Sequence, residues 1–143
     1  MSKSNVFEND LLKLFFNGTA IPGLADNAVA TPLTNLYLAL HTADPGESGT
    51  QSTSEVAYTG YSRIAVARST SGWTVTDNSV SPTVAIEFGE MTGGVPGTAT
   101  HISIGTASSG SGKILYRGQL SPSVAFNIGV VPRLRTTSTI TED

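Results

Sequence analysis

The clearest pattern in the chain is a short alternation of apolar and other residues that ends at a turn. It is best developed in the stretch 36–46, where Leu36, Leu38 and Leu40 alternate with Tyr37, Ala39 and His41. Such a period of two predicts a strand that buries its three leucines on one face. The Asp-Pro-Gly sequence at 44–46 combines residues that favour a reversal, so the strand is expected to end in a turn there.

The same alternation recurs along the rest of the chain and predicts an all-β protein. Further strands are expected at 61–68, 73–76, 84–88, 101–106, 113–119, 124–128 and 133–140. Their inward-facing sets include Ile64 with Val66, the trio Val84, Ile86 and Phe88, and Ile102 with Ile104. About eight strands with irregular loops fit a jelly-roll-like β-sandwich.

One helix is predicted before the strands, over residues 5–17. Its apolar stripe is formed by Val6, Phe7, Leu11, Leu14 and Phe15, and Phe16 widens it. Asn17-Gly18 offers a left-handed C-cap. Two interpretations of this face stay open: it covers one end of the β-domain, or it docks on a partner subunit. Residues 18–34 are rich in turn-forming residues, so we expect a helix-plus-linker segment over 1–34, a β-sandwich over 35–143, and one folding unit overall.

A polar loop at 44–59 follows the first strand, and a loop of this length is either mobile or ordered by a contact. His41 and His101 each fall opposite the apolar positions of their strands, so both are expected to face solvent or a partner. If those two strands were neighbours, the rings could meet and recruit Asp44 or Glu47 to a metal ion, although nothing in the spacing requires it.

Composition excludes several classes of function. The net charge is -3 and the eight Lys and Arg residues are dispersed, which argues against a nucleic-acid partner. No apolar run approaches the roughly 20 residues of a membrane span, and the N-terminus lacks the order of a signal peptide. We therefore expect no membrane partner and synthesis in the cytoplasm. The absence of cysteine excludes a disulfide scaffold and thiolate zinc sites.

No catalytic centre is predicted. The Gly-rich stretch 105–113 resembles a phosphate-binding loop, but Ala107 and Ile114 occupy positions that need Gly and Ser or Thr, and a strand follows where a helix is required. No nucleophile elbow precedes a helix. Glycosidase-type chemistry by paired carboxylates stays formally open. The sequence predicts neither an enzyme nor a cofactor or metal.

Four segments together resemble a family of small tailed-phage virion proteins, many of them labelled tail-fibre proteins and some acting as head decoration or cement proteins with a jelly-roll fold. The segments are Leu36–Glu47, Gly60–Arg63, Ala99–Gly105 and Ile114–Gly118, and the helix at 5–17 resembles the family's N-terminal segment. The resemblance covers about residues 5 to 130.

The resemblance implies a structural protein of the virion. The leading hypothesis is a capsid decoration or cement protein on the capsid surface, which binds the major capsid protein and stabilises the shell. It is also expected to bind itself, as a homodimer or with another symmetry. Many weak contacts can then act together on one particle. The alternative is a tail-fibre or baseplate module that binds a host receptor, with exposed Tyr37, Tyr58, Tyr61 or Trp73 stacking on a glycan. The predicted contact residues are Phe7, Leu11, Phe15, Phe16, His41, Asp44, Glu47, Arg133 and Arg135.

Overall fold

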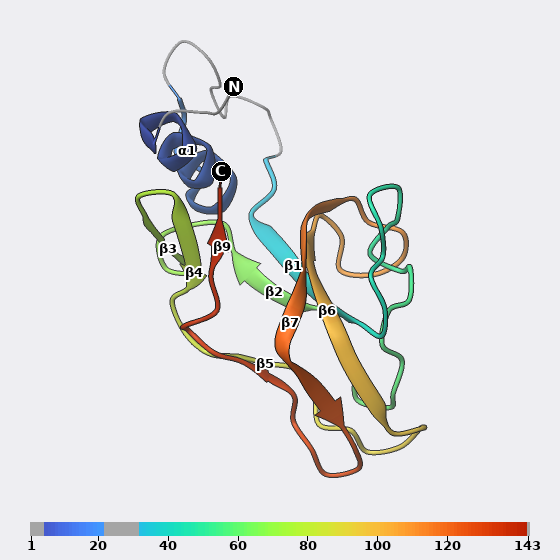
Figure 1. Ribbon diagram of the computed structural model, residues 1–143. Helices are drawn as coiled ribbons and strands as arrows, with labels where there is room; N and C mark the ends of the chain where they lie inside the picture. The colour runs from blue at the N-terminus through green and yellow to red at the C-terminus, as the bar shows by residue number, and fades with distance from the viewer. Residues whose placement is uncertain (1–4, 22–31, 143) are drawn as a thin grey trace. The chain divides into compact units, whose positions relative to one another are not determined.

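The computed structural model describes residues 5–21 and 32–142, and within them the protein is mostly β with one N-terminal helical segment (Figure 1). The helical segment is α1 (Asn5–Leu12) followed by a π-helical turn, η1 (Lys13–Asn17). The strands are β1 (Asn35–His41), β2 (Ile64–Ala67), β3 (Trp73–Thr76), β4 (Ser79–Pro82), β5 (Ile86–Glu87), β6 (Gly97–Gly105), β7 (Ile114–Phe126), β8 (Arg133–Leu134) and β9 (Ile140–Thr141). They form sheets in the orders β2-β1-β6-β7, β3-β4-β9 and β5-β8. The predicted fold class, an all-β sandwich type with one N-terminal helix, is confirmed.

The chain divides into two compact units. Unit 1 consists of Met1–Asn35, Val66–Ile86 and Leu134–Asp143, and unit 2 of Leu36–Ala65 and Glu87–Arg133. The predicted boundary at residue 34 stays a prediction, and residues 22–31 of the predicted linker lie outside the described residues. Within the described ranges, no helix is long and apolar enough to cross a membrane.

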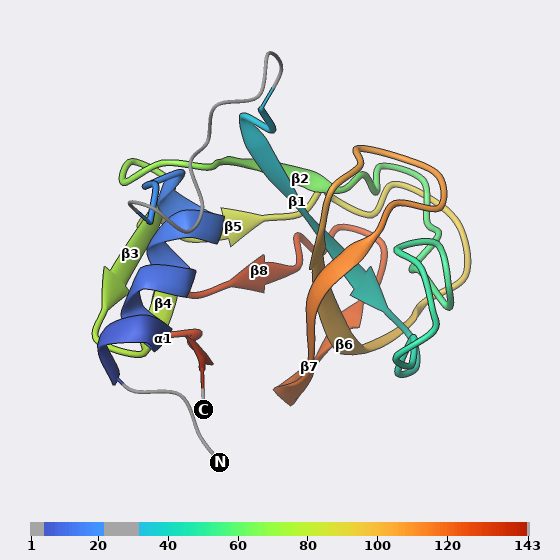
Figure 2. The same cartoon turned by 90° about the horizontal axis from the view of Figure 1, so that it is seen from above.

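In unit 1 the helical segment packs on the antiparallel sheet of β3, β4 and β9 (Figure 2). Leu12 and Phe16 are fully buried, and the Phe16 ring meets Trp73 edge to face with centroids 4.8 Å apart. Asn17 Nδ2 donates to the Trp73 carbonyl oxygen at 3.1 Å. The Arg68 guanidinium donates to two carbonyl oxygens at the end of the helical segment, those of Leu14 (2.5 Å) and Phe15 (2.7 Å). A cation there also complements the negative end of the helix dipole.

The range of the predicted helix and its Gly18 cap are confirmed, because Gly18 has a φ of 67° and its N–H donates to the Lys13 carbonyl oxygen. The apolar stripe of the sequence is not the face that the helical segment buries. Val6 is 74% and Phe7 38% exposed, whereas the buried positions are Glu8, Leu12 and Phe16, spaced four residues apart. In a regular α-helix such a row drifts around the axis, and the wider π turn at its end holds the row on one face.

Unit 2 is built on β1, β6 and β7; β6 lies between the other two strands and pairs antiparallel with each of them. Leu36, Leu38 and Leu40 are buried as predicted, and Leu38 lies opposite Ile104. The predicted strands at 113–119 and 124–128 are one continuous strand, β7. Its register against β6 shifts between Ala99 and His101, so residues 120–123 bulge.

Three expectations about strands are wrong. Strand β4 is absent from the predicted set because its sequence, Ser-Val-Ser-Pro, has a single large apolar residue. Val84 is 66% exposed, since β4 ends at Pro82 and β5 begins only at Ile86, so that residues 83–85 have no strand pairing. The predicted strand 133–140 is divided into β8 and β9 by a turn in which the Ser138 N–H donates to the Arg135 carbonyl oxygen.

Candidate functional site

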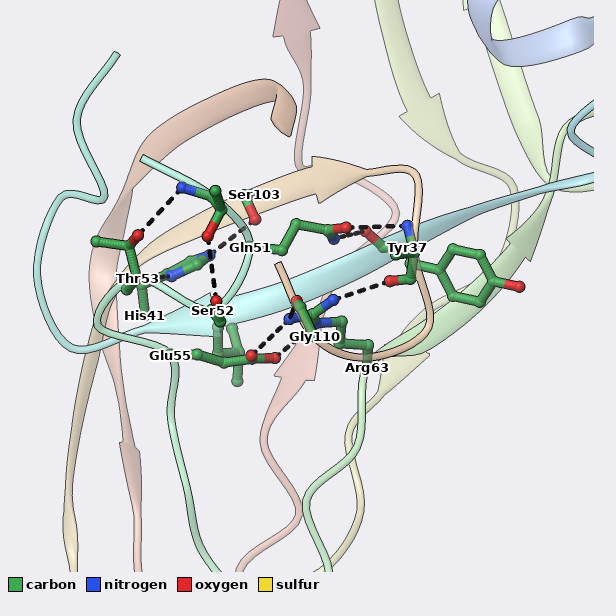
Figure 3. Close-up of polar contacts among 12 residues, drawn as sticks. Tyr37, His41, Gln51, Ser52, Thr53, Glu55, Arg63, Ser103 and Gly110 are labelled. Atoms are coloured by element: carbon green, nitrogen blue, oxygen red, sulfur yellow. Dashed lines mark hydrogen bonds and ion pairs between the residues drawn. The ribbon is translucent and has the colours of Figure 1, made fainter. Parts of the chain in front are cut away.

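The long loop after β1 in unit 2 is ordered by contacts within its own unit (Figure 3). The Thr42 N–H donates to the Ser54 carbonyl oxygen (2.8 Å) and the Val56 N–H to the Leu40 carbonyl oxygen (2.9 Å). The loop therefore leaves β1, turns, and returns along it. Of the two possibilities for this loop, mobile or held by a contact, the structure has the second, with the contact supplied by unit 2.

Gln51 fixes the middle of this loop. Its side chain is fully buried; Nε2 donates to the Tyr37 carbonyl oxygen (3.0 Å) and Oε1 accepts from the Ala107 N–H (3.0 Å). Its own N–H donates to the Gly112 carbonyl oxygen (2.9 Å). One amide side chain thus ties the loop to β1 and to the turn between β6 and β7. A buried amide with all these bonds made rigidifies the segment that carries it.

Two glycines make room for that amide. A Cβ on Gly105 would lie 2.2 Å from Gln51 Cδ, and one on Gly112 would lie 2.3 Å from Gln51 Oε1. Any larger residue would collide with the side chain. Two of the three glycines in the stretch 105–113, which resembles a phosphate loop in sequence, are therefore explained by the close approach of Gln51; the third, Gly110, has a φ of 71°.

A buried ion pair holds the other arm of the loop. Arg63 Nε and Nη2 donate to Glu55 Oε1 (2.8 Å) and Oε2 (2.7 Å), and the Arg63 side chain is only 2% exposed. Nη1 and Nη2 also donate to the carbonyl oxygens of Ala107 (3.0 Å) and Gly110 (2.6 Å). This bidentate hydrogen bond with Glu55 raises the pKa of Arg63. The pair joins the loop to the same turn that Gln51 reaches.

His41 is buried, which corrects the expectation that it faces outward. Nδ1 lies 2.8 Å from the Thr53 carbonyl oxygen, which can only accept, so this nitrogen carries the proton. Nε2 lies 2.7 Å from Ser103 Oγ and accepts from that hydroxyl in the neutral ring. Burial lowers the pKa of His41 and favours this neutral form. The parity of β1 is misleading at His41 because the returning loop covers the second face of the strand.

His101 lies directly opposite His41 in the β1–β6 register, so the two strands are neighbours, which was the condition for the hypothetical metal site. The metal site does not follow from it. His41 uses both ring nitrogens within the protein, and His101 Nδ1 lies 2.9 Å from Thr100 Oγ1. Among the residues that the structure describes, no group of three or more His, Asp or Glu side chains could hold a metal ion.

Asp44 and Glu47 do come together, around Arg117 of β7. Arg117 Nη1 donates to Asp44 Oδ1 (2.7 Å), and Arg117 Nη2 lies 3.9 Å from Glu47 Oε1. The Gly46 N–H donates to Asp44 Oδ1 and, with Arg117, lowers the pKa of Asp44. The predicted turn is confirmed by this bond and by a φ of 75° at Gly46.

These contacts define a rigid surface that we name the polar end of unit 2: the loop 44–54 with the turn 106–113. Behind it lie the buried side chains of Gln51 and Arg63; its exposed positions are Asp44, Glu47, Ser48, Ser52, Thr53, Ser54, Ser108, Ser109, Gly110, Ser111 and Lys113. The arrangement offers hydroxyl groups and backbone groups on a fixed frame. It suits recognition of a polar partner at little ordering cost.

The other predicted contact residues lie outside the polar end. Phe16 is fully buried against Trp73, so it belongs to the core of unit 1 rather than to a surface. Leu11 and Phe15 are half-buried in the helical segment, beside the more exposed Phe7. Arg133 in unit 2 is exposed and pairs with Glu87, and Arg135 is exposed in unit 1; contacts of these residues with a partner stay predictions.

The predicted glycan-stacking aromatics are only in part accessible. Trp73 and Tyr58 are buried, 1% and 6% exposed, so the expectation that they stack on a sugar is wrong. Tyr61 is half-buried; its hydroxyl accepts from the Leu40 N–H (3.0 Å) and donates to Glu55 Oε1 (3.2 Å). Tyr37 is half-buried.

Comparison with known proteins gives one family. No curated protein matches the chain. The model of the family described as podophage GP4 fiber I protein gp80 matches residues 2–141, almost the whole chain. The predicted resemblance to tailed-phage virion proteins is thereby confirmed. The chain belongs to the family of podophage GP4 fiber I protein gp80 and is a fibre-type structural protein of a phage virion.

Proposed function

We propose that the protein is a tail-fibre module that binds a host-surface receptor through the polar end of unit 2. The observation that carries the proposal is the family match over residues 2–141, since its description names a podophage fibre protein. The geometry supports a binding role. The loop that carries Asp44 and Glu47 is held in one conformation by buried, hydrogen-bonded side chains, so little conformational entropy is lost when a partner binds.

A head decoration role is the second candidate. What favours it is the resemblance of four segments to a family of tailed-phage virion proteins, some of which act as head decoration proteins. Three of the segments overlap β1, β6 and β7, the central strands of unit 2. In that role the partner is the major capsid protein and the position is the capsid surface. Self-association as a homodimer belongs to both proposals.

We propose a binding role without catalysis. In support, His41 is neutral, buried and bonded at both ring nitrogens, and Glu55 is engaged by Arg63, so neither is placed to move a proton to a substrate. An assay with host surface polysaccharide tests this part. We expect no release of oligosaccharides, and release that is lost with a single carboxylate variant would show an enzyme instead.

Protein quantification in purified particles discriminates the two locations. For a tail fibre we expect a copy number comparable with that of the other tail proteins, and binding of the purified protein to host cells that competes with phage adsorption. For a head decoration protein we expect a copy number comparable with that of the major capsid protein and co-sedimentation with empty heads. A surface variant such as Glu47→Lys, which lies on the polar end with a 94% exposed side chain, should weaken binding without changing stability.

A further inference from the structure

The large exposed apolar residues of unit 2 gather at one end of it. All residues of unit 2 are described, and its exposed large hydrophobic residues are Val95 (82%), Ile128 (69%), Val131 (42%) and Val130 (37%). We call this set the apolar end. Val95 and Ile128 each lie two residues beyond the Gly97–Phe126 pair, the last pair of the β6–β7 ladder on the side away from the turn that joins the two strands. The polar turn 106–113 lies at the opposite end of the same two strands (Figure 1).

Ile128 stands at the tip of a tight turn that holds it away from the core. The Val130 N–H donates to the Asn127 carbonyl oxygen (2.9 Å), and Gly129 has a φ of 82°, as the third position of a type II turn requires. The turn is pinned from behind, since the Gly129 N–H donates to the Met91 carbonyl oxygen and the Met91 N–H to the Val130 carbonyl oxygen. Turn tips normally carry polar residues, so an isoleucine here needs another reason.

Val95 is presented in the same way by the neighbouring loop. It lies in the sequence Gly93-Gly94-Val95-Pro96-Gly97, and Gly94 has a φ of 105°. The loop is anchored by the Thr59 N–H, which donates to the Gly93 carbonyl oxygen (2.9 Å). With 82% of its surface exposed, Val95 adds nothing to the core of unit 2. Two independent turns therefore hold aliphatic side chains outward at one place, the pattern of an interface rather than of scattered surface apolar residues.

We propose that the apolar end is the surface on which a second copy of this chain docks, with the two apolar ends facing each other across a two-fold axis. The charges beside it argue for this occupant. Glu87 and Arg133 form an exposed ion pair next to the valines, and exposed Glu90 precedes Met91, so the rim carries both signs. A patch that carries an apolar centre and a rim of both signs is complementary to itself, as an isologous contact requires.

This arrangement leaves the polar end of each copy at the far side of its sheet, pointing away from the axis. Apolar area would be removed from water at the centre, while Arg133 of one copy could meet Glu90 of the other at the rim. The inference is independent of the location proposed above, because a two-fold pair of this kind can serve a tail fibre or a head decoration protein.

Analytical ultracentrifugation of the full chain tests the proposal. We expect the wild type to sediment as a dimer that dissociates on dilution, and Ile128→Asp to sediment as a monomer at concentrations at which the wild type is a dimer. The matched control is Val84→Asp, which places the same charge on an equally exposed aliphatic site (66%) in unit 1 and should leave the dimer intact. Urea unfolding at a protein concentration low enough for the wild type to be monomeric should give equal midpoints for all three proteins, which shows that both variants fold.

The lack of cysteine provides a second measurement. In Ile128→Cys the only thiol of each chain lies at the proposed axis, so a short bis-maleimide should link two chains efficiently at dilute protein concentration. Val84→Cys should give little linked product. A wild type that stays monomeric at the highest attainable concentration, a dimer that survives Ile128→Asp, or equal cross-linking of the two cysteine variants would overturn the proposal.

Discussion

Replacing Arg63 by alanine should destabilise unit 2 more than any surface charge change. The Arg63 side chain is 2% exposed and donates four hydrogen bonds, two to Glu55 and one each to the carbonyl oxygens of Ala107 and Gly110. Its removal leaves a mostly buried carboxylate without its cation, which typically costs about 3–5 kcal/mol. Because Glu55 is 18% exposed and water can reach it, we expect about 3 kcal/mol, near the lower end of that range.

Urea unfolding measures this loss, with the midpoint lowered and the m-value unchanged. Hydrogen exchange should at the same time become faster in the loop 44–54 and the turn 106–113, because Arg63 joins them. The control is Arg133→Ala, which breaks an ion pair whose side chains are 59% and 51% exposed and should cost less than about 1 kcal/mol. If Arg63→Ala were no more destabilising than Arg133→Ala, the buried pair would not be what fixes the polar end.

Three further perturbations test other parts of the structure. Acidification below about pH 6.5 should lower stability, because the folded state holds His41 with a lowered pKa and the unfolded chain takes up the proton more readily. In His41→Gln the urea midpoint should depend less on pH between about pH 7.5 and 5.5. The same pH dependence in the variant and the wild type would contradict the role assigned to His41. Gly105→Ala should cost about 1–3 kcal/mol because its Cβ would meet the Gln51 side chain, whereas Gly118→Ala, with nothing within 4 Å, should be near neutral; equal midpoints would refute the close fit. Arg68→Ala should speed hydrogen exchange in the helical segment, since two charged hydrogen bonds worth about 1.5–3 kcal/mol each are lost, and Arg68→Lys should restore part of the protection; an unaffected helix would exclude this capping role.

The sequence predicted the elements whose apolar residues recur with a regular period. The three leucines of β1 are buried as their alternation indicates, and the helical segment begins and ends where its pattern and cap place it. The buried face of the helix was missed because a charged residue, Glu8, takes one position of the buried row that Leu12 and Phe16 continue, and the apolar residues alone trace a different stripe.

The polar frame of unit 2 could not be predicted because its contacts join residues far apart in sequence. Gln51 meets Ala107 and Arg63 meets Gly110, over 56 and 47 residues. His41 was placed outward because strand parity assumes one open face, and the returning loop covers that face. One signal was present in the sequence. Gly105 and Gly112 flank the turn, and a turn of this length does not need both glycines for its backbone conformation, so their presence indicates a side chain packed against it.

A cryo-electron microscopy map of the intact virion tests the central claim most directly. We expect density that fits unit 2 in the fibres of the tail, in two-fold pairs, with the loop 44–54 facing outward. Density for unit 2 across the capsid surface would support the head decoration role instead. Absence of the protein from purified infectious particles would contradict a structural role in the virion altogether.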